Sequence, residues 1–241
     1  RFFMDRRQFI KAGTLLPAAA AVSGWPGFAA AKTTADSQWR MYEVTTQVEV
    51  LKPAGVTRVW LPLPLTVDTD YQKDHGSKWS AEGGKAVFSR DPKYGAGIVS
   101  AEWAEGAQRP TLKLVSRFAT REYIVDLKNP SNPWPADRAT QALYLAPTEL
   151  IPTDGIVRKT ALGALKGEKA GAKTDVAKAE AIYQWVVENT ERDPTTRGCG
   201  VGDVKSMLET GNINGKCADI NALFVGLARA VGIPARDVYG V

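Results

Sequence analysis

The sequence is poor in the residues from which metal centres and disulfide scaffolds are built. Its 241 residues contain two cysteines, Cys199 and Cys217, and a single histidine, His75. Two cysteines are too few for a small fold held together by disulfides. One histidine excludes any site within this chain that needs two or more, such as a histidine-rich zinc centre. We therefore expect no metal and no cofactor.

A large excess of one charge is also missing. The 31 Lys and Arg residues against 26 Asp and Glu give a net charge of +5, and residues 1–31 alone supply +3 of it. The rest of the chain is nearly neutral, so nothing points to nucleic acid or to an anionic membrane as a partner. Apolar residues make up 44% and charged residues 24%, the usual mix of a soluble globular protein. That mix excludes a disordered, collagen-like or multi-span membrane protein.

The N-terminal region contains one apolar stretch, and it is short. Residues 12–22 are too few for a bilayer span, which needs about 20 residues, but they suit the apolar region of a signal peptide. The segment before them contains Arg6 and Arg7 and resembles the twin-arginine export signal of bacteria. Small residues at 29–31 suggest a cleavage site. We expect a signal peptide at 1–31, recognition by the twin-arginine export machinery, no stable membrane span, and a periplasmic or extracellular location; a basic anchoring helix is the alternative.

Residues 36–128 show the pattern of an antiparallel β domain. From Trp39 to Leu51 apolar and polar residues alternate, which is typical of a half-buried strand. Turn-forming Gly, Pro and Asp clusters separate further strand-like runs at 56–61, 85–89, 97–103, 111–118 and 121–127. About six short strands without helical periodicity predict an antiparallel sandwich-like domain. His75 is expected in a polar, solvated loop.

The second half of the chain is predicted to be helical after a linker. Five prolines mark 129–154 as that linker, and 155–241 form the second domain. An apolar stripe from Val176 to Val187 predicts a helix capped by Thr174 or Asp175. A short helix is expected over 204–210, between a capping Asp203 and a terminating Gly211.

A helix that is apolar on most sides is predicted to start at Asn214 or Gly215 and to stop before Gly232. Cys217 then lies in its first turn, where unpaired N–H groups and the helix dipole stabilise a thiolate relative to a thiol. Because the thiolate is the attacking species, Cys217 is the candidate nucleophile. An oxyanion would need two donors. The Cys217 N–H is one candidate, and the side-chain amide of Asn212 or Asn214 is the other.

These residues resemble a known motif. The run 215–219 (Gly-Lys-Cys-Ala-Asp), the helix after it and the run 232–236 (Gly-Ile-Pro-Ala-Arg) are similar to the cysteine-helix motif of the bacterial transglutaminase-like superfamily, which are papain-like cysteine enzymes. The resemblance implies an α+β fold, in which an N-terminal antiparallel β-sandwich-like domain precedes the helical first half of a papain-like core. It also implies a strand at 238–241 and a thioester on Cys217.

The family places its catalytic histidine, and then an aspartate, on strands after the second of these runs. The chain reaches Val241 within the first of those strands, before either group. We therefore expect a C-terminally truncated piece of a longer protein that is inactive by itself.

Several interpretations stay open. In an oxidising compartment Cys199 and Cys217 could form a disulfide, which would block the nucleophile. Gly215 and Asp219 belong to the motif, and Asp219 either orients a neighbouring group or complements the helix dipole. For the whole protein, the first hypothesis is an exported cysteine protease, amidase or acyl transferase with a peptide or protein substrate. The second is a non-catalytic periplasmic protein that binds peptide or polysaccharide, or serves as a scaffold, on the same fold.

Overall fold

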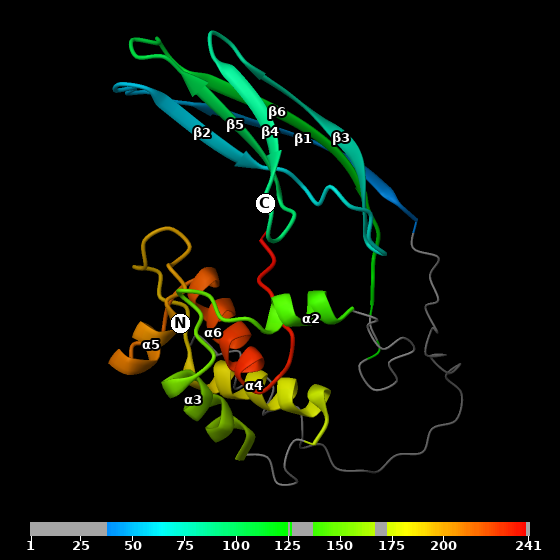
Figure 1. Ribbon diagram of the computed structural model, residues 1–241, viewed down its shortest axis with the longest axis vertical. Coiled ribbons are helices and arrows are strands. Elements are labelled where there is room, and N and C mark those ends of the chain that lie inside the picture. Colours follow the sequence, from blue (N-terminus) through cyan, green and yellow to red (C-terminus); the bar gives the residue numbers. More distant parts are fainter. Residues whose placement is uncertain (1–37, 125, 127–136, 167–172, 240–241) are drawn as a thin grey trace, which may run out of the picture.

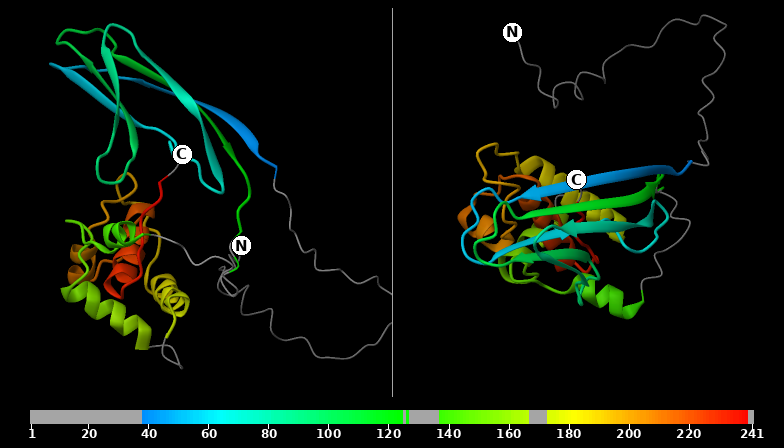
Figure 2. Two further views of the ribbon diagram at one scale, coloured as in Figure 1. Left: turned by 45° about the vertical axis from the view of Figure 1, so that its right-hand side comes forward. Right: turned by 90° about the horizontal axis from the view of Figure 1, so that it is seen from above.

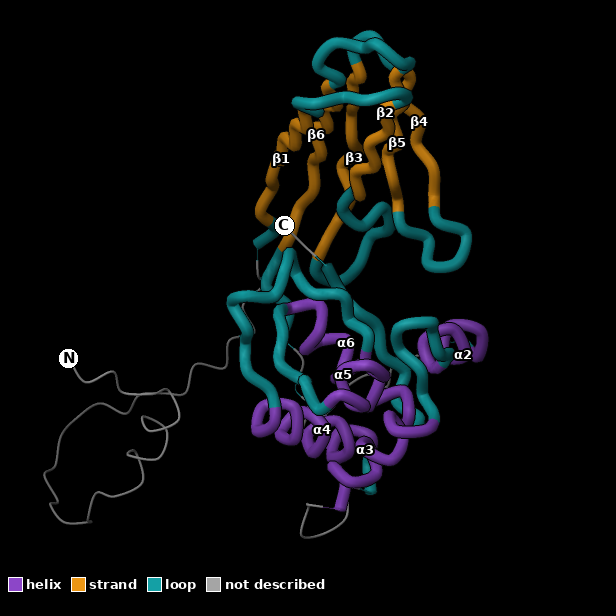
Figure 3. The backbone as a smooth tube through the Cα atoms, turned by 90° about the vertical axis from the view of Figure 1, so that its left-hand side faces the viewer, coloured by secondary structure: helices purple, strands orange, loops and turns teal. Residues whose placement is uncertain are grey.

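The computed structural model describes residues 38–124, 126, 137–166 and 173–239. Six strands come first along the chain and helices follow them. Figure 1 and Figure 3 show the strands gathered in one part of the molecule and the helices in another. The predicted mixture of antiparallel sheet and helix is therefore confirmed. The predicted signal peptide, with Arg6 and Arg7, lies outside the described residues.

The strands form two three-stranded antiparallel sheets, in the orders β1-β6-β3 and β2-β5-β4. The strands are β1 (Arg40–Glu49), β2 (Thr57–Pro62), β3 (Gln72–Ala81), β4 (Lys85–Arg90), β5 (Gly97–Trp103) and β6 (Thr111–Thr120). In the first sheet Glu49 lies opposite Thr111, and in the second Thr57 lies opposite Trp103. Five of the six strands lie where the alternation of the sequence predicts them.

The two sheets share one hydrophobic core. Alternate residues of a strand point to the same side, and on β5 and β6 these residues are buried. They are Val99, Ala101, Trp103, Leu112 and Leu114. Trp103 also donates a hydrogen bond from Nε1 to the Glu82 carbonyl at 2.9 Å. A Cβ on Gly84 would lie 2.5 Å from that nitrogen, so the chain can pass the indole there only as glycine.

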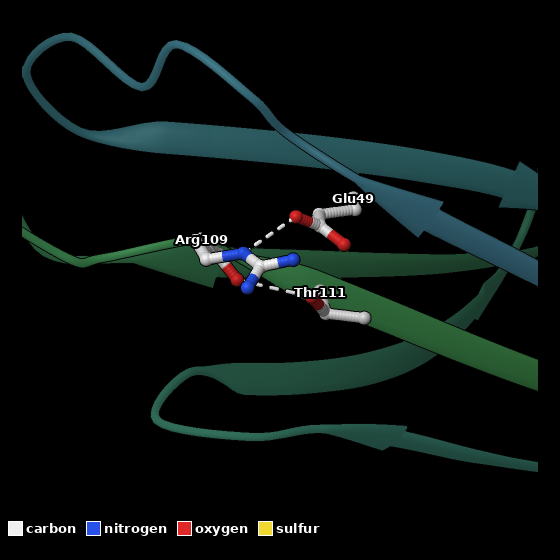
Figure 4. Close-up of polar contacts among 3 residues, drawn as sticks. All are labelled: Glu49, Arg109 and Thr111. Atoms are coloured by element: carbon white, nitrogen blue, oxygen red, sulfur yellow. Dashed lines mark hydrogen bonds and ion pairs between the residues drawn. The ribbon is translucent and has the colours of Figure 1, made fainter.

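A turn residue with unusual backbone geometry precedes β6. Arg109 has a φ of +52°, in the left-handed region that non-glycine residues seldom occupy. Figure 4 shows its side chain reaching Glu49 at the end of β1, with Nε 2.7 Å from Oε1. The Thr111 hydroxyl donates to the Arg109 carbonyl at 3.0 Å. The hydrogen bond and the charge of Glu49 raise the pKa of Arg109. These contacts hold the turn where β6 begins beside β1.

Two strand predictions are wrong. His75 lies on β3 and not in a loop, although it is exposed as expected. Alternation did not show β3, because this edge strand is polar and carries an irregularity between Asp74 and Ser77. The described residues of 121–127 form no strand. Both partner strands of β6 begin opposite Thr120, so the strand ladder ends there. Beyond it the Arg121 N–H still donates to the Tyr71 carbonyl at 3.1 Å.

The helices pack around a second hydrophobic core. They are α2 (Arg138–Leu145), α3 (Gly155–Lys166), α4 (Asp175–Asn189), α5 (Val204–Thr210) and α6 (Cys217–Ala230). The core residues come from α3 to α6 and from Ile151 in the preceding loop. The segment interpreted as a linker therefore contains a helix, α2, and one buried core residue. Within the described residues no helix is long and apolar enough to cross a membrane.

The predicted ends of the helices agree with the structure better than the predicted buried faces do. Thr174 caps α4, Asp203 caps α5 through the Ser206 N–H, and Gly211 ends α5 at φ +72°. The apolar stripe of α4 is only half buried, however. Its buried residues are Ala181, Ile182 and Val186, whereas Val176, Tyr183 and Val187 are exposed. Only the side of α4 that meets α3 and α6 is covered.

Candidate functional site

Cys217 is the first residue of α6 and is exposed. Lys216 is the N-cap, so the helix begins slightly later than predicted. The chain before it is held by residues 191–193. The Gly215 N–H donates to the Glu191 carbonyl at 3.2 Å, and the Asp193 N–H donates to the Gly215 carbonyl at 2.8 Å. The start of α6 is therefore fixed to a second loop, and the cysteine stands at the surface where the helix opens.

Asp219 joins this helix start to the loop that contains Cys199. Its side chain is 7% exposed. Oδ1 accepts the N–H groups of Val201 and Gly202, both at 2.9 Å. Oδ2 accepts the N–H of Lys216 at 3.0 Å. Of the two roles considered for Asp219, the contacts support the orientation of neighbouring groups.

Two glycines give that carboxylate its space. A Cβ on Gly200 would lie 1.9 Å from Asp219 Oδ2, and one on Gly215 would lie 2.3 Å from the same oxygen. Gly200 also has a φ of +94°, which side chains rarely adopt. The motif position Gly215 therefore serves close packing against Asp219.

The two cysteines lie side by side. The Cys199 carbonyl accepts the Ala218 N–H at 2.9 Å, and Cys217 Sγ lies 3.9 Å from the same oxygen. Both are free, exposed thiols. The hydrogen bond to Cys217, the charge of that neighbour and burial raise the pKa of Cys199, and the Lys216 ammonium opposes the rise. The disulfide between them stays a prediction.

The two candidate oxyanion donors lie in the loop that leads into α6. The Asn214 side-chain oxygen accepts the Glu191 N–H at 2.8 Å, which leaves the amide hydrogens as the donors it could offer. Asn212 is exposed, and its backbone N–H donates to the Thr210 hydroxyl at 3.4 Å. Sequence reasoning missed Asn221, whose Nδ2 donates to the Cys217 carbonyl at 2.7 Å. Its i+4 spacing from Cys217 was the available signal.

A pocket of about 470 Å³ opens one helical turn beyond Cys217. It is lined by Tyr144, Asn221, Phe224, Val225, Pro234, Ala235, Arg236, Asp237 and Val238. The pocket exists because the chain turns back after α6, at Gly232 with φ +87°. Figure 2 shows this returning segment in red as it rises beside the helix.

A buried arginine holds the returning segment in place. Arg229 Nε donates to the Ala235 carbonyl at 2.8 Å, and its guanidinium also donates to the Ala146 carbonyl at 3.1 Å. The Ala235 N–H donates to the Tyr144 carbonyl at 3.1 Å. The loop after α2 and the end of α6 are thereby tied together around one wall of the pocket.

Two titratable groups of the returning segment have shifted pKa values. Burial raises the pKa of Asp237, against the lowering effect of Arg229, and Asp237 Oδ1 is buried without a hydrogen-bond partner. Burial, the charge of Asp237 and the two thiols raise the pKa of Tyr239. The strand expected at 238–241 is not formed at 238–239, and residues 240–241 lie outside the described part.

Across residues 38–124, 126, 137–166 and 173–239, no three His, Cys, Asp or Glu side chains are grouped so that they could hold an ion.

Comparisons with known proteins agree with the cysteine-helix motif. Residues 163–241 match the transglutaminase-like superfamily. An uncharacterized protein of Haemophilus influenzae is 37% identical over 210 residues, which cover 83% of this chain and 55% of that protein. The chain thus spans little more than half of that relative's length.

A solved structure shares the fold. A crystal structure from Cytophaga hutchinsonii, described as a "Putative Cysteine Protease", aligns with a TM-score of 0.57 at 16% identity over 82% of this chain and 67% of that one. Residues 163–241 are thus similar to the transglutaminase-like superfamily, and most of the chain shares the fold of that crystal structure.

Proposed function

We propose that Cys217 is the nucleophile of a thiol enzyme that acts on amide or peptide carbonyls. The observation that carries the proposal is the position of the thiol, exposed on the first residue of a helix whose remaining residues are mostly buried. The opening N–H groups of a helix lack partners within it and carry partial positive charge, which favours an anionic sulfur. A buried structural cysteine would instead be inert.

The surroundings of Cys217 are suited to hold it still while a substrate binds. Asp219 and the Cys199 carbonyl fix the backbone on one side of the thiol. Asn221 fixes the Cys217 carbonyl and leads into the pocket. We assign that pocket to part of the substrate, because it is partly apolar, concave and within one turn of the sulfur.

The proposed reaction has two steps. The Cys217 thiolate attacks the carbonyl carbon, and the amine leaves as the thioester forms, taking the proton that the general base accepted from the Cys217 thiol. Water then releases the acid, or an amine releases a new amide. The Cys217 N–H and the Asn214 or Asn212 amide are the proposed donors to the oxyanion.

A general base is also required, and His75 lies on β3, in the other part of the molecule. We propose that a histidine and an aspartate encoded after Val241 complete the site. The span of only 55% of the Haemophilus influenzae relative favours this. Sequencing the gene beyond the codon for Val241 tests this proposal directly. We expect a histidine within a few tens of residues, followed by an aspartate, and the absence of both would refute the proposal.

The full-length protein tests the nucleophile. Iodoacetamide at mildly acidic pH should alkylate Cys217 at least about ten-fold faster than a free-cysteine peptide. With casein peptides and hydroxylamine, thioester capture should yield hydroxamates. Cys217→Ser should abolish them, whereas the matched variant Cys199→Ser should retain them. If Cys217 is alkylated only at the rate of the free peptide and no hydroxamates form, the proposal of a thiol enzyme is refuted and the non-catalytic binding role is favoured.

We propose export through the twin-arginine route on the basis of residues 1–31. Fusing them to a folded reporter should carry it to the periplasm. Replacing Arg6 and Arg7 by Lys should keep it in the cytoplasm. Export that is indifferent to this replacement would contradict the proposal.

A further inference from the structure

We propose that Cys199 and Cys217 form a reversible redox pair, whose internal disulfide blocks the nucleophile and whose reduction releases it. The inference rests on the proposed function, since it concerns control of the same sulfur. It does not depend on which amide is the substrate.

The backbone already brings the two residues together. Although they are 18 positions apart, the Ala218 N–H donates to the Cys199 carbonyl at 2.9 Å, and Cys217 Sγ lies 3.9 Å from that oxygen. A disulfide needs two cysteines whose backbones lie close together, and the hydrogen bond from Ala218 to Cys199 places these two loops side by side. Both thiols are exposed, so a soluble oxidant can reach them.

The loop around Cys199 has room to adjust. Gly198 and Gly200 flank it, and both have positive φ, at +62° and +94°. No atom lies within 4 Å of the position that a Cβ would take on Gly198, whereas Gly200 is pressed against Asp219. The Cys199 carbonyl and Gly200 are held against α6, whereas the Gly198 side of the loop faces open space. In the proposal, the loop adjusts on this side when the bridge closes.

The two sulfurs take different roles in the proposed bridge. Cys217 attacks first, because it stands exposed on the first residue of α6, and Cys199, in the adjoining loop, attacks second. The hydrogen bond to Cys217 and the charge of that neighbour also raise the pKa of Cys199. One attacking thiol beside a second, resolving thiol is the arrangement that forms an internal disulfide from an external one.

The oxidant we name is a small-molecule disulfide, such as glutathione disulfide. Cys217 attacks one of its sulfurs, forming a mixed disulfide and releasing one glutathione. Cys199 then attacks the Cys217 sulfur, which breaks the mixed disulfide and releases the second glutathione. Two electrons pass from the protein sulfurs to glutathione disulfide, and the two thiol protons end on the two glutathione molecules. Excess dithiothreitol reverses the sequence.

Intact mass and alkylation test the proposal on the full-length protein. After glutathione disulfide treatment, the wild type should lose two hydrogens in mass and carry no adduct. Iodoacetamide labelling of Cys217 should fall at least about 100-fold and return with dithiothreitol. Cys199→Ser should instead keep one glutathionyl group on Cys217, because no second thiol resolves it. Cys199→Ala repeats this test with a side chain that cannot donate.

Two results would overturn the redox pair. One is a wild type that accumulates the same glutathionyl adduct as Cys199→Ser; the other is a wild type in which both thiols stay alkylatable. The readout does not use substrate turnover, so the two proposals can fail separately. If hydroxamates form but no disulfide does, the enzyme proposal stands and the redox pair is refuted. If the disulfide forms but hydroxamates do not, the redox pair stands and the enzyme proposal is refuted.

Discussion

Replacing Asp219 by Ala should destabilise the helical part of the molecule and loosen the cysteine site. The carboxylate accepts three backbone N–H groups, from Val201, Gly202 and Lys216, at 2.9 to 3.0 Å. Alanine offers none of these acceptors. The loop before α5 and the first turn of α6 would both lose their common partner.

The magnitude follows from how well water can replace the carboxylate. Gly202 is buried, so its N–H would bear most of the cost of an unsatisfied donor, about 1–3 kcal/mol. Val201 is exposed and Lys216 partly so, and their N–H groups can turn to solvent at about 0.5–1 kcal/mol each. We expect a total loss of about 2–5 kcal/mol. Asp219→Asn should lose less, because one amide oxygen can still serve Val201 and Gly202.

Far-UV circular dichroism at the helical band, followed during urea unfolding, measures this loss in the part that contains the helices. The rate of Cys217 alkylation should change in the same variants. Asp175→Ala is a matched control, since that aspartate is exposed on α4 and pairs only with the nearby Lys178. If Asp219→Ala unfolds within about 0.5 kcal/mol of the control, the three hydrogen bonds do not hold the site as described.

Four further variants test neighbouring features. Gly200→Ala should cost about 2–4 kcal/mol by urea unfolding, because its Cβ would meet Asp219, whereas Gly198→Ala, in open space, should cost about 1–2 kcal/mol; equal losses would contradict the close packing. Arg229→Met should lose about 1.5–3 kcal/mol, since two carbonyls lose a charged donor; an unchanged melting temperature would refute this. Asp237→Asn should stabilise the protein at pH 7 by less than about 1 kcal/mol. Its raised pKa means that the carboxyl favours folding below its ordinary value of 3.8 and loses that contribution as pH rises, so the gain should vanish in acid melts; a constant gain would contradict it.

The features that were predictable from the sequence are those with local causes. The caps of α5 depend on Asp203 and Gly211, which lie next to the helix, and the place of Cys217 in the first turn of α6 follows from the apolar spacing after it. The strands β5 and β6 alternate because one face of each is buried.

The features that escaped prediction depend on partners far along the chain. β3 is polar and is a strand only because β6 lies beside it, and residues 121–124 are not a strand because neither neighbour extends that far. Asp219 carries no mark in the sequence that points to Val201 and Gly202, which lie 18 and 17 positions earlier. The pocket likewise forms only when the chain after Gly232 folds back on α6.

The two separate hydrophobic cores have a consequence for the order of folding during synthesis. All six strands are complete by Thr120, so the core between the sheets can close while the helices are still being translated. The second core takes many of its buried residues from α6, which comes after every other described helix. Cys199 is therefore translated before its partner, and the two thiols meet only when α6 docks on the helices that precede it.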